Sequence, residues 1–506
     1  MAKNFYITTT LPYVNSDPHL GFAMELIRAD VIARFKKTQG FDIFFNTGTD
    51  EHGLKIWQAA QKAGLPPTRA GGARAGQNIQ SYCDARAARF RELVPALGIL
   101  PEVNFIRTTD SRHERAAREF WKICHKAGYI YKKNYAIKYC VGCELEKTES
   151  ELENGRCPVH PARELETIEE ENYFFRFSAF QNQLLEFYKK TPDFVVPENR
   201  FREIKKFMES GLQDFSISRL KEKMPWGVEV PDDSSQVMYV WFDALTNYIS
   251  ALGWGTSPLL SKEGAGGGSL GEENLFEKFW VNGTPTQYCG KDNLRQQSAM
   301  WQAMLMAAGL PTSRQIVIDG FINISGQKMS KSVGNIADPF ELVKEYSADA
   351  VRYFVLRELH PFEDSDYTPE KFKEAYNANL ANGLGNLVSR IMKMAESALV
   401  APVLEPLADN LPPEFSSALE KFETNKAADF VWNKIGKLDS EIQKTQPFSL
   451  IKTDAEKGRE IIRNLILGLW NIIPMLQILL PDTAQLIKET IKLNKMPAES
   501  LFLRKE

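Results

Sequence analysis

Two short segments, far apart in the sequence, carry residues suited to binding a nucleoside triphosphate. His19 and Gly21 follow a strand-like segment and stand where a segment with helical spacing begins. A helix N-terminus suits a phosphate, an imidazole can hold phosphate oxygens, and a glycine lets a nucleotide approach the backbone closely. Lys328 and Lys331 stand three residues apart in a glycine-flanked loop. Two ammonium groups on a flexible loop can bind a triphosphate and neutralise departing pyrophosphate.

Each of these segments also has an ordinary structural interpretation. A histidine at a strand–helix junction can simply cap or pack the helix, and two lysines in a loop can simply be solvated. The complete string at 326–335, which reads GQKMSKSVGN, is much rarer than a random pair of lysines.

A third group of residues has the spacing of metal ligands. Two ligand pairs, each separated by two residues and joined by a short polar segment, predict one tetrahedral site of three thiolates and an imidazole. These residues are Cys140, Cys143, Cys157 and His160. Four protein ligands close such a site, so the predicted zinc ion is structural. The other three of the six cysteines have no visible partners and are predicted to be buried thiols.

The elements that must position these residues follow from the apolar pattern. Residues 5–11 predict a buried strand, 20–39 a helix that ends at Gly40, and 41–46 a second strand. Strand, helix and strand in this order form the βαβ unit of a doubly wound, Rossmann-like α/β sheet. Two later segments, 237–242 and 315–322, are predicted as further strands, so a connective insertion splits the sheet.

The C-terminal part differs in character. Long segments with helical spacing, notably 372–398 and 460–480, predict an all-α bundle. The glycine-rich residues 261–269 predict a surface loop.

The expected division is a first catalytic half at 1–115, the insertion at 116–230, a second catalytic half at 231–325, a lysine-loop and stem-contact region at 326–367, and the bundle at 368–506.

Composition is that of a soluble, multi-unit protein. The 506 residues are 43% hydrophobic and 25% charged, and the net charge of −3 neither indicates nor excludes a nucleic-acid partner. No apolar stretch approaches the roughly 20 residues of a membrane span, and the start has no signal-peptide pattern. We therefore expect a cytoplasmic protein without a membrane partner.

The motifs together resemble one enzyme class. His19-Leu20-Gly21-Phe22 resembles the HIGH signature of class I aminoacyl-tRNA synthetases, and 328–332 matches their KMSKS signature in every letter. The resemblance implies attack of an amino-acid carboxylate on the α-phosphate of ATP, which enters with Mg²⁺, and then transfer to tRNA. Phe22 departs from the signature, because phenyl cannot donate to phosphate. The loss implies a rate lower by on the order of 10²-fold unless another donor compensates.

Strings at 11–15, 47–53, 214–219 and 239–244 resemble the methionyl branch of that class. The resemblance implies that Asp50 binds the substrate ammonium and that Asp292, after Gly290, faces the ATP ribose. An apolar, aromatic wall suits a thioether, and the implied wall residues are Leu11, Tyr13, Trp241 and Tyr248. Asn293 and Gln297 replace the usual isoleucine and histidine, which makes the pocket more polar. The closest rival substrates are cysteine, isoleucine, leucine and valine.

In the bundle, the resemblance assigns anticodon reading to Asn386 and Arg390, with Phe448 where a stacking tryptophan is usual. Asn386 and Arg390 are four apart and share a helix face; an exposed polar face is the ordinary alternative. The implied partners are tRNA(Met), ATP and L-methionine, and the implied state is a monomer. Two other functions stay open: a small-molecule nucleotidylyltransferase, and a catalytically silent paralogue that binds tRNA or a protein.

Overall fold

The central element is a parallel sheet of six strands. The computed structural model describes residues 3–64, 73–143, 145–147, 152–255, 274–324, 327–328, 336–407, 410–497 and 499–506. The strands, in spatial order, are β3 (Asn104–Arg107), β2 (Asp42–Thr49), β1 (Asn4–Thr8), β12 (Thr284–Gly290), β13 (Gln315–Asp319) and β7 (Val195–Val196). Every pairing is parallel. Strand order reverses between β1 and β12, and ligands of such sheets bind beyond the carboxyl ends at this point.

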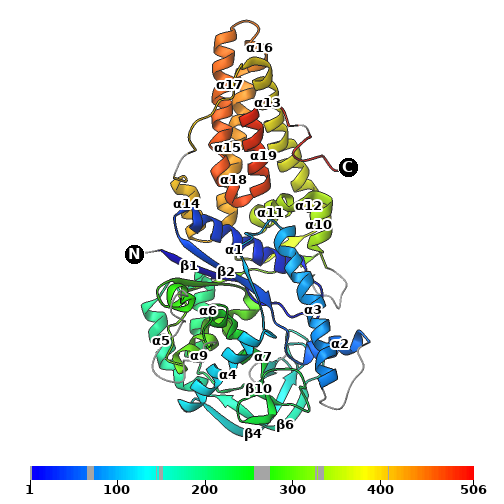
Figure 1. Cartoon of the computed structure of the whole chain (residues 1–506), viewed down its shortest axis with the longest axis vertical. Helices are drawn as coiled ribbons and strands as arrows, with labels where there is room; N and C mark the ends of the chain where they lie inside the picture. Colours follow the sequence, from blue (N-terminus) through cyan, green and yellow to red (C-terminus); the bar gives the residue numbers. More distant parts are fainter. Residues whose placement is uncertain are drawn as a thin grey trace.

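The two faces of the sheet have different coverings because alternate side chains point to opposite faces. Phe5 and Ile7 of β1 join the core that contains α1 (Leu20–Thr38), α3 (Ala73–Ala96) and the C-terminal helices. Tyr6 joins the core formed with α4 (Ser111–Lys126) and α9 (Trp301–Ala307). Figure 1 shows α1 between the sheet and the bundle, with α4 and α9 toward the opposite end. The predicted split α/β sheet is confirmed.

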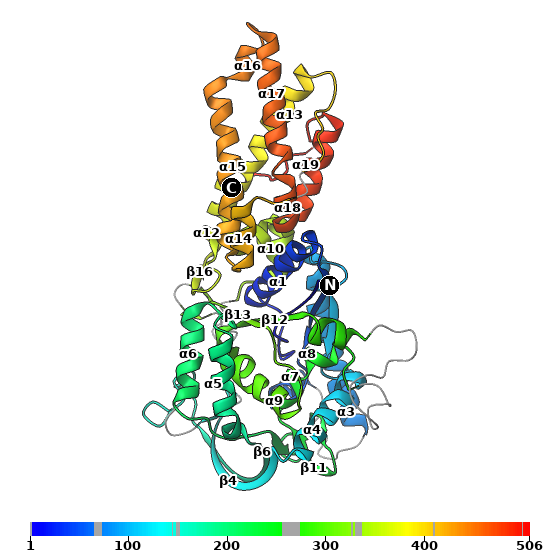
Figure 2. The same cartoon turned by 90° about the vertical axis from the view of Figure 1, so that its left-hand side faces the viewer.

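The segment between the two sheet halves forms mainly antiparallel strands. One sheet has the order β5-β4-β6-β8, with β4 (Ile130–Cys140), β5 (Leu145–Lys147), β6 (Glu166–Phe175) and β8 (Phe215–Ser216). Helices α5 (Gln181–Lys190) and α6 (Glu198–Glu209) flank β7, which pairs with β13. Strands β4 and β6 lie at the end of the molecule away from the bundle (Figure 2).

The predicted strand at 237–242 is wrong in its second half. Strand β11 (Asp233–Met238) ends there and pairs antiparallel with β9 (Ser218–Leu220) and β10 (Glu229–Val230), outside the parallel sheet. Helix α7 (Val240–Leu245) follows, then α8 (Asn247–Ser250). A short apolar run fits a buried strand and a buried helix equally well. Packing of Phe242 against Phe120 and Trp121 on α4 favours the helix.

The predicted helical region is confirmed. The helices are α10 (Pro339–Tyr346), α11 (Ala348–Tyr353), α12 (Pro369–Ala375), α13 (Asn386–Ala398), α14 (Pro413–Glu420), α15 (Thr424–Thr445), α16 (Pro447–Leu450), α17 (Ala455–Trp470), α18 (Ile473–Leu479) and α19 (Pro481–Leu493). A π-helical segment, Tyr376–Gly385, joins α12 to α13. A small sheet of β14 (Ile322–Ile324), β15 (Gln327–Lys328) and β16 (Ser365–Tyr367) precedes the bundle.

One described stretch, Ala455–Leu479, is apolar enough to span a membrane by composition alone. More than half of its most apolar window, 56%, is buried inside the protein. Its residues pack in the same core as α13 and α15, so we assign it to the interior of the bundle. The predicted glycine-rich loop at 261–269 lies outside the described residues.

Candidate active site and metal centre

A cavity of about 1270 Å³ opens at the carboxyl ends of the central strands. The predicted substrate residues that line it are Leu11, Tyr13, His19, Gly21, Asp50, Trp241, Tyr248, Gly290, Asp292, Asn293 and Gln297. They come from the turn after β1, the start of α1, the turn after β2, helices α7 and α8, the end of β12 and the short helical segments that follow it. Residues that are hundreds of positions apart therefore meet at the switch point of the sheet.

His19 is the N-cap residue of α1. Its Nδ1 accepts a hydrogen bond from the Gly21 amide, 3.1 Å away. The capping interpretation is thus confirmed, and it restricts the ring, because an accepting Nδ1 places the proton of a neutral imidazole on Nε2. A Cβ atom at Gly21 would lie 3.0 Å from the Cε1 and Nδ1 atoms of His19. Gly21 therefore leaves room for this ring as well as for a ligand.

Phe22 is buried, 8% exposed, at the border of the cavity. Its ring meets that of Phe90 edge to face, with centroids 5.4 Å apart. The side chain that replaces the signature histidine is therefore part of the apolar core.

Two cavity residues missed by the sequence analysis are carboxylic acids. Glu25 lies one turn beyond Gly21 on α1, and its Oε1 accepts the Thr10 amide hydrogen. Burial, reinforced by the charge of Asp319, raises the pKa of Glu25 well above its usual range. Burial also raises the pKa of Asp319 to about 6, although its partner Arg28 acts in the opposite direction. A neutral Glu25 would add no repulsion against phosphates. Its i, i+4 relation to Gly21 was the available sequence signal.

Asp50 and its neighbours form the other end of the cavity. The Asp50 amide donates to the Pro12 carbonyl at 2.9 Å, and its carbonyl accepts from the Val14 amide at 3.2 Å. The turns after β1 and β2 are therefore joined by two backbone hydrogen bonds. Asp50 is 4% exposed. Tyr248 is buried, and Trp241 is partly buried at the start of α7.

This end of the cavity contains buried polar atoms, one of them on Gln297, which departs from the family pattern. Gln297 is 1% exposed, and its Nε2 donates to Thr10 Oγ1 at 3.3 Å. Within the described part of the chain, Gln297 Oε1, Gln296 Oε1 and Trp241 Nε1 are buried without a hydrogen-bond partner. Gln296, which the sequence analysis did not single out, also lines the cavity. A ligand that enters here meets polar groups as well as aromatic ones.

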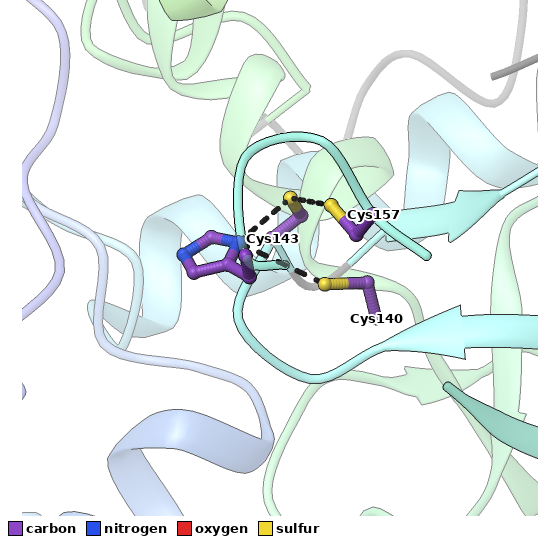
Figure 3. Close-up of side chains that lie close together, drawn as sticks. Cys140, Cys143 and Cys157 are labelled. Atoms are coloured by element: carbon purple, nitrogen blue, oxygen red, sulfur yellow. Dashed lines mark hydrogen bonds between the residues drawn. The ribbon is translucent and has the colours of Figure 1, made fainter. Parts of the chain in front are cut away.

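The four predicted metal ligands converge. Their ligand atoms all lie within 4.8 Å of one another, and Figure 3 shows the three cysteines pointing toward a common centre. Cys143 Sγ lies 3.4 Å from Cys157 Sγ and 3.2 Å from His160 Nδ1. Tetrahedral zinc–thiolate bonds imply ligand separations of roughly 3.8 Å, so the group fits one metal ion. A Cβ at Gly142 would lie 2.5 Å from the His160 ring, so glycine there permits the approach.

The metal centre also borders the cavity. Cys143 and His160 line it, together with Lys147 and Arg163 from the same insertion. The sequence predicted that the insertion splits the catalytic sheet, but no sequence pattern indicated that these basic side chains reach the cavity.

The remaining predicted residues lie elsewhere. Lys328 ends β15, where only its backbone is described and pairs with Asn323, and Lys331 lies outside the described residues. Asn386 is exposed on α13. Arg390, on the same helix, forms an ion pair with Asp439 on α15. Phe448 lies in α16 and is 53% exposed.

Comparison with known proteins first gives the class. A sequence model of the family described as "tRNA synthetases class I (M)" matches residues 5–164 and 142–392. With its parallel sheet and its cavity at the switch point, the protein is a class I tRNA synthetase.

Individual relatives indicate which kind of class I tRNA synthetase the chain is similar to. A methionine–tRNA ligase of Thermotoga maritima is 36% identical over 512 residues, which cover 98% of this chain and 76% of the relative. That of Thermosynechococcus vestitus is 45% identical over 398 residues, covering 78% of this chain and 70% of the relative. A solved Mycobacterium tuberculosis methionyl-tRNA synthetase in complex with methionyl-adenylate has a TM-score of 0.83 at 33% identity, and 99% of this chain and 98% of that chain are covered. The chain belongs to the methionine–tRNA ligase family.

Proposed function

We propose that this ligase forms methionyl-adenylate in the cavity between β1, α1 and α7 and then transfers methionine to tRNA(Met). In the first step, a methionine carboxylate oxygen bonds to the α-phosphorus of ATP, and the bond to the bridging oxygen of the leaving pyrophosphate breaks. No covalent enzyme intermediate is needed, so catalysis is positioning and charge stabilisation. The observation that carries the proposal is the convergence of His19, Asp292, Asp50 and Trp241 on one cavity.

The phosphate end of the cavity contains His19 and Gly21. With Nδ1 occupied by the Gly21 amide, His19 Nε2 carries the proton that it offers to a phosphate oxygen. We assign the ribose to Asp292 and the backbone at Gly290. Lys328 and Lys331 neutralise the departing pyrophosphate. Bound Mg²⁺ would supply further charge neutralisation at the ATP phosphates.

The opposite end accepts methionine. Asp50 pairs with the ammonium group, because a buried carboxylate is stabilised by an opposite charge. The wall for the side chain is formed by Leu11, Tyr13, Trp241, Tyr248, Asn293 and Gln297, all of which border the cavity.

We assign zinc to the Cys₃His group, because three thiolates and one imidazole in a closed set are typical of structural zinc. The ion would hold the loop after β4 against the segment that ends at His160. When bound, it would supply folding energy to this loop, and the closed ligand set leaves it no position for adenylation chemistry.

The bundle provides the proposed anticodon site, with Asn386 and Arg390 reading bases and Phe448 stacking on one. The exposure of Asn386 and Phe448 supports these roles. We retain the division at 1–115, 116–230, 231–325, 326–367 and 368–506 as a proposal, together with a monomeric state and a cytoplasmic location. Light scattering on the purified enzyme tests the monomer: a mass of twice 57.4 kDa would refute it.

Exchange of labelled pyrophosphate into ATP, run with each of the twenty amino acids, tests the proposed activity. Exchange that depends on methionine alone is expected. Exchange with cysteine, isoleucine, leucine or valine would reassign the substrate, and no exchange with any amino acid would favour the silent paralogue. Charging of tRNA(Met) in the same preparation excludes a nucleotidylyltransferase.

A further inference from the structure

A buried cluster of three ionisable side chains lies behind the amino-acid end of the cavity. His52 Nδ1 lies 2.6 Å from Asp243 Oδ2, and His113 Nε2 lies 2.9 Å from Asp243 Oδ1. Asp243 and His113 are completely buried, and His52 is 3% exposed. None of the three lines the cavity, so none contacts a substrate there.

Each member of the cluster is linked to a segment that carries a cavity residue. His52 lies two positions after Asp50, and its amide faces Asp50 Oδ1 at 3.5 Å. Asp243 lies two positions after Trp241 in α7. The third segment is α8, which carries Tyr248.

His113, on α4, makes the link to α8. Its Nδ1 lies 2.9 Å from Ser250 Oγ, and Ser250 is the last residue of α8. Through His113, the carboxylate of Asp243 is therefore connected to the helix of Tyr248. The cluster joins three segments that are distant in sequence and that meet at the proposed methionine pocket.

The cluster holds a buried charge. Burial acts to raise the pKa of Asp243, but the charge of His52 and the hydrogen bonds from His113 and His52 outweigh burial and keep this pKa well below its usual range. Burial acts to lower the pKa of His52, but the charge and hydrogen bond of Asp243 raise it overall. The cluster therefore favours the ionised form of Asp243, and Asp243 in turn favours the protonated form of His52.

Stability alone is a poor explanation for such a pair. Taking two charges out of water costs about as much free energy as their attraction gains, and apolar side chains in their place often stabilise the fold equally well. A paired charge does fix geometry, because any separation of the partners leaves a charge buried alone.

We propose that His52, Asp243 and His113 form a clamp that sets the distances between Asp50, Trp241 and Tyr248. The three are positioning residues, because they act through the residues that border the substrate. The clamp rests on the proposed roles of Asp50, Trp241 and Tyr248 in methionine binding.

Asp243→Asn tests the clamp in the zinc-loaded enzyme, with KM for methionine and KM for ATP measured by pyrophosphate exchange. A misplacement of about 1 Å can cost on the order of 10²-fold. We expect KM for methionine to rise at least tenfold, with KM for ATP changed less than about twofold. His52→Gln and His113→Gln, which keep a hydrogen-bonding group, should give smaller changes in the same direction and cover the case in which Asp243→Asn does not fold.

Asp30→Asn is the matched control. Asp30 is also completely buried, and it pairs with Arg352 at 2.7 Å between α1 and α11, away from the cavity. This variant should melt at a lower temperature but keep the KM for methionine of the parent enzyme. Equal effects of the Asp30 and Asp243 variants on KM would overturn the clamp.

Asp50→Asn separates the proposed role of Asp50 in methionine binding from the proposed role of the clamp. If Asp50→Asn raises KM for methionine and the cluster variants do not, the proposed methionine pocket is supported and the proposed clamp is refuted. If Asp50→Asn leaves KM for methionine unchanged, the proposed role of Asp50 in methionine binding is refuted.

The pH dependence gives a readout that a purely structural role would not produce. The groups that face His52 are Asp243 on α7, Glu114 on α4 and Glu51 on its own turn. Glu51 is itself paired with Arg107 of β3. Because the pKa of His52 is raised, the charged pair is favoured at pH below this raised pKa and is lost as pH rises through it. The ratio of KM for methionine between His52→Gln and the parent enzyme should therefore fall at alkaline pH; a ratio independent of pH would contradict the charged state of the clamp.

Discussion

Asparagine in place of His19 should keep helix α1 capped but remove the imidazole nitrogen that we assign to ATP. Nδ1 of His19 accepts the Gly21 amide hydrogen at 3.1 Å. Asparagine Oδ1 stands the same number of bonds from the backbone and is among the preferred N-cap acceptors. Asparagine has no counterpart of Nε2. The substitution therefore separates a structural role from a catalytic one.

The expected magnitudes differ enough to decide between the two roles. Loss of one donor to a developing phosphate charge costs about 2.7–4 kcal/mol of transition-state stabilisation, on the order of 10²–10³-fold in rate. Loss of an N-cap costs about 1 kcal/mol of folding stability. His19→Asn should thus slow adenylation without lowering the melting temperature. His19→Ala should slow it similarly and also destabilise the fold.

The assay is single-turnover formation of methionyl-adenylate, followed by rapid quench, with thermal unfolding of the same samples. KM for methionine should stay near the parent value in both variants, because His19 lies at the phosphate end. A His19→Asn enzyme that forms adenylate at the parent rate would refute the reasoning. The imidazole would then be a helix cap only.

Phe22→His should raise the rate of pyrophosphate exchange, by up to about 10²-fold, because it restores a donor; loss of the edge-to-face contact with Phe90 should lower stability by about 1 kcal/mol. An unchanged exchange rate would show that another group already fills this role. Gln297→Leu should reduce discrimination between methionine and norleucine, measured as the ratio of kcat/KM, because it removes the buried amide beside Thr10; an unchanged ratio would exclude contact with the thioether. Removal of zinc by a chelator should lower the melting temperature, with Cys157→Ser as the genetic counterpart. An unaltered melting profile after verified metal loss would contradict a structural site.

The sequence predicted what depends on local pattern. The first strand, helix and strand have long, regular periodicity, and the structure places them within a few residues of the prediction. The structure also confirms that the four residues of the Cys₃His group converge, as their spacing predicted. Two residues between ligands suit a tight turn that brings each pair together. These features needed no knowledge of the rest of the chain.

Features that depend on tertiary packing were not predicted. The run at 237–242 becomes half strand and half helix because Phe242 packs on α4. Strand β12 was missed, since Pro285 and polar residues such as Gln287 hide a strand whose side-chain partners lie far away in sequence. Glu25 and Arg163 enter the cavity only because the fold brings α1 and the insertion to the same edge.

Two of the departures from the family pattern, Phe22 and Gln297, border the cavity together with Glu25. Thr10 links Gln297 to Glu25, because its amide donates to Glu25 and its hydroxyl oxygen accepts from Gln297. Phe22 lies three residues before Glu25 on the same face of α1, and both border the cavity. Histidines at 22 and 297 would place two protonatable rings near this carboxyl and so lower its pKa. Phenylalanine and glutamine bring no such charge, and burial raises the pKa of Glu25 well above its usual range. Restoring one histidine, as in Phe22→His, therefore brings back only one of the two rings that could lower this pKa.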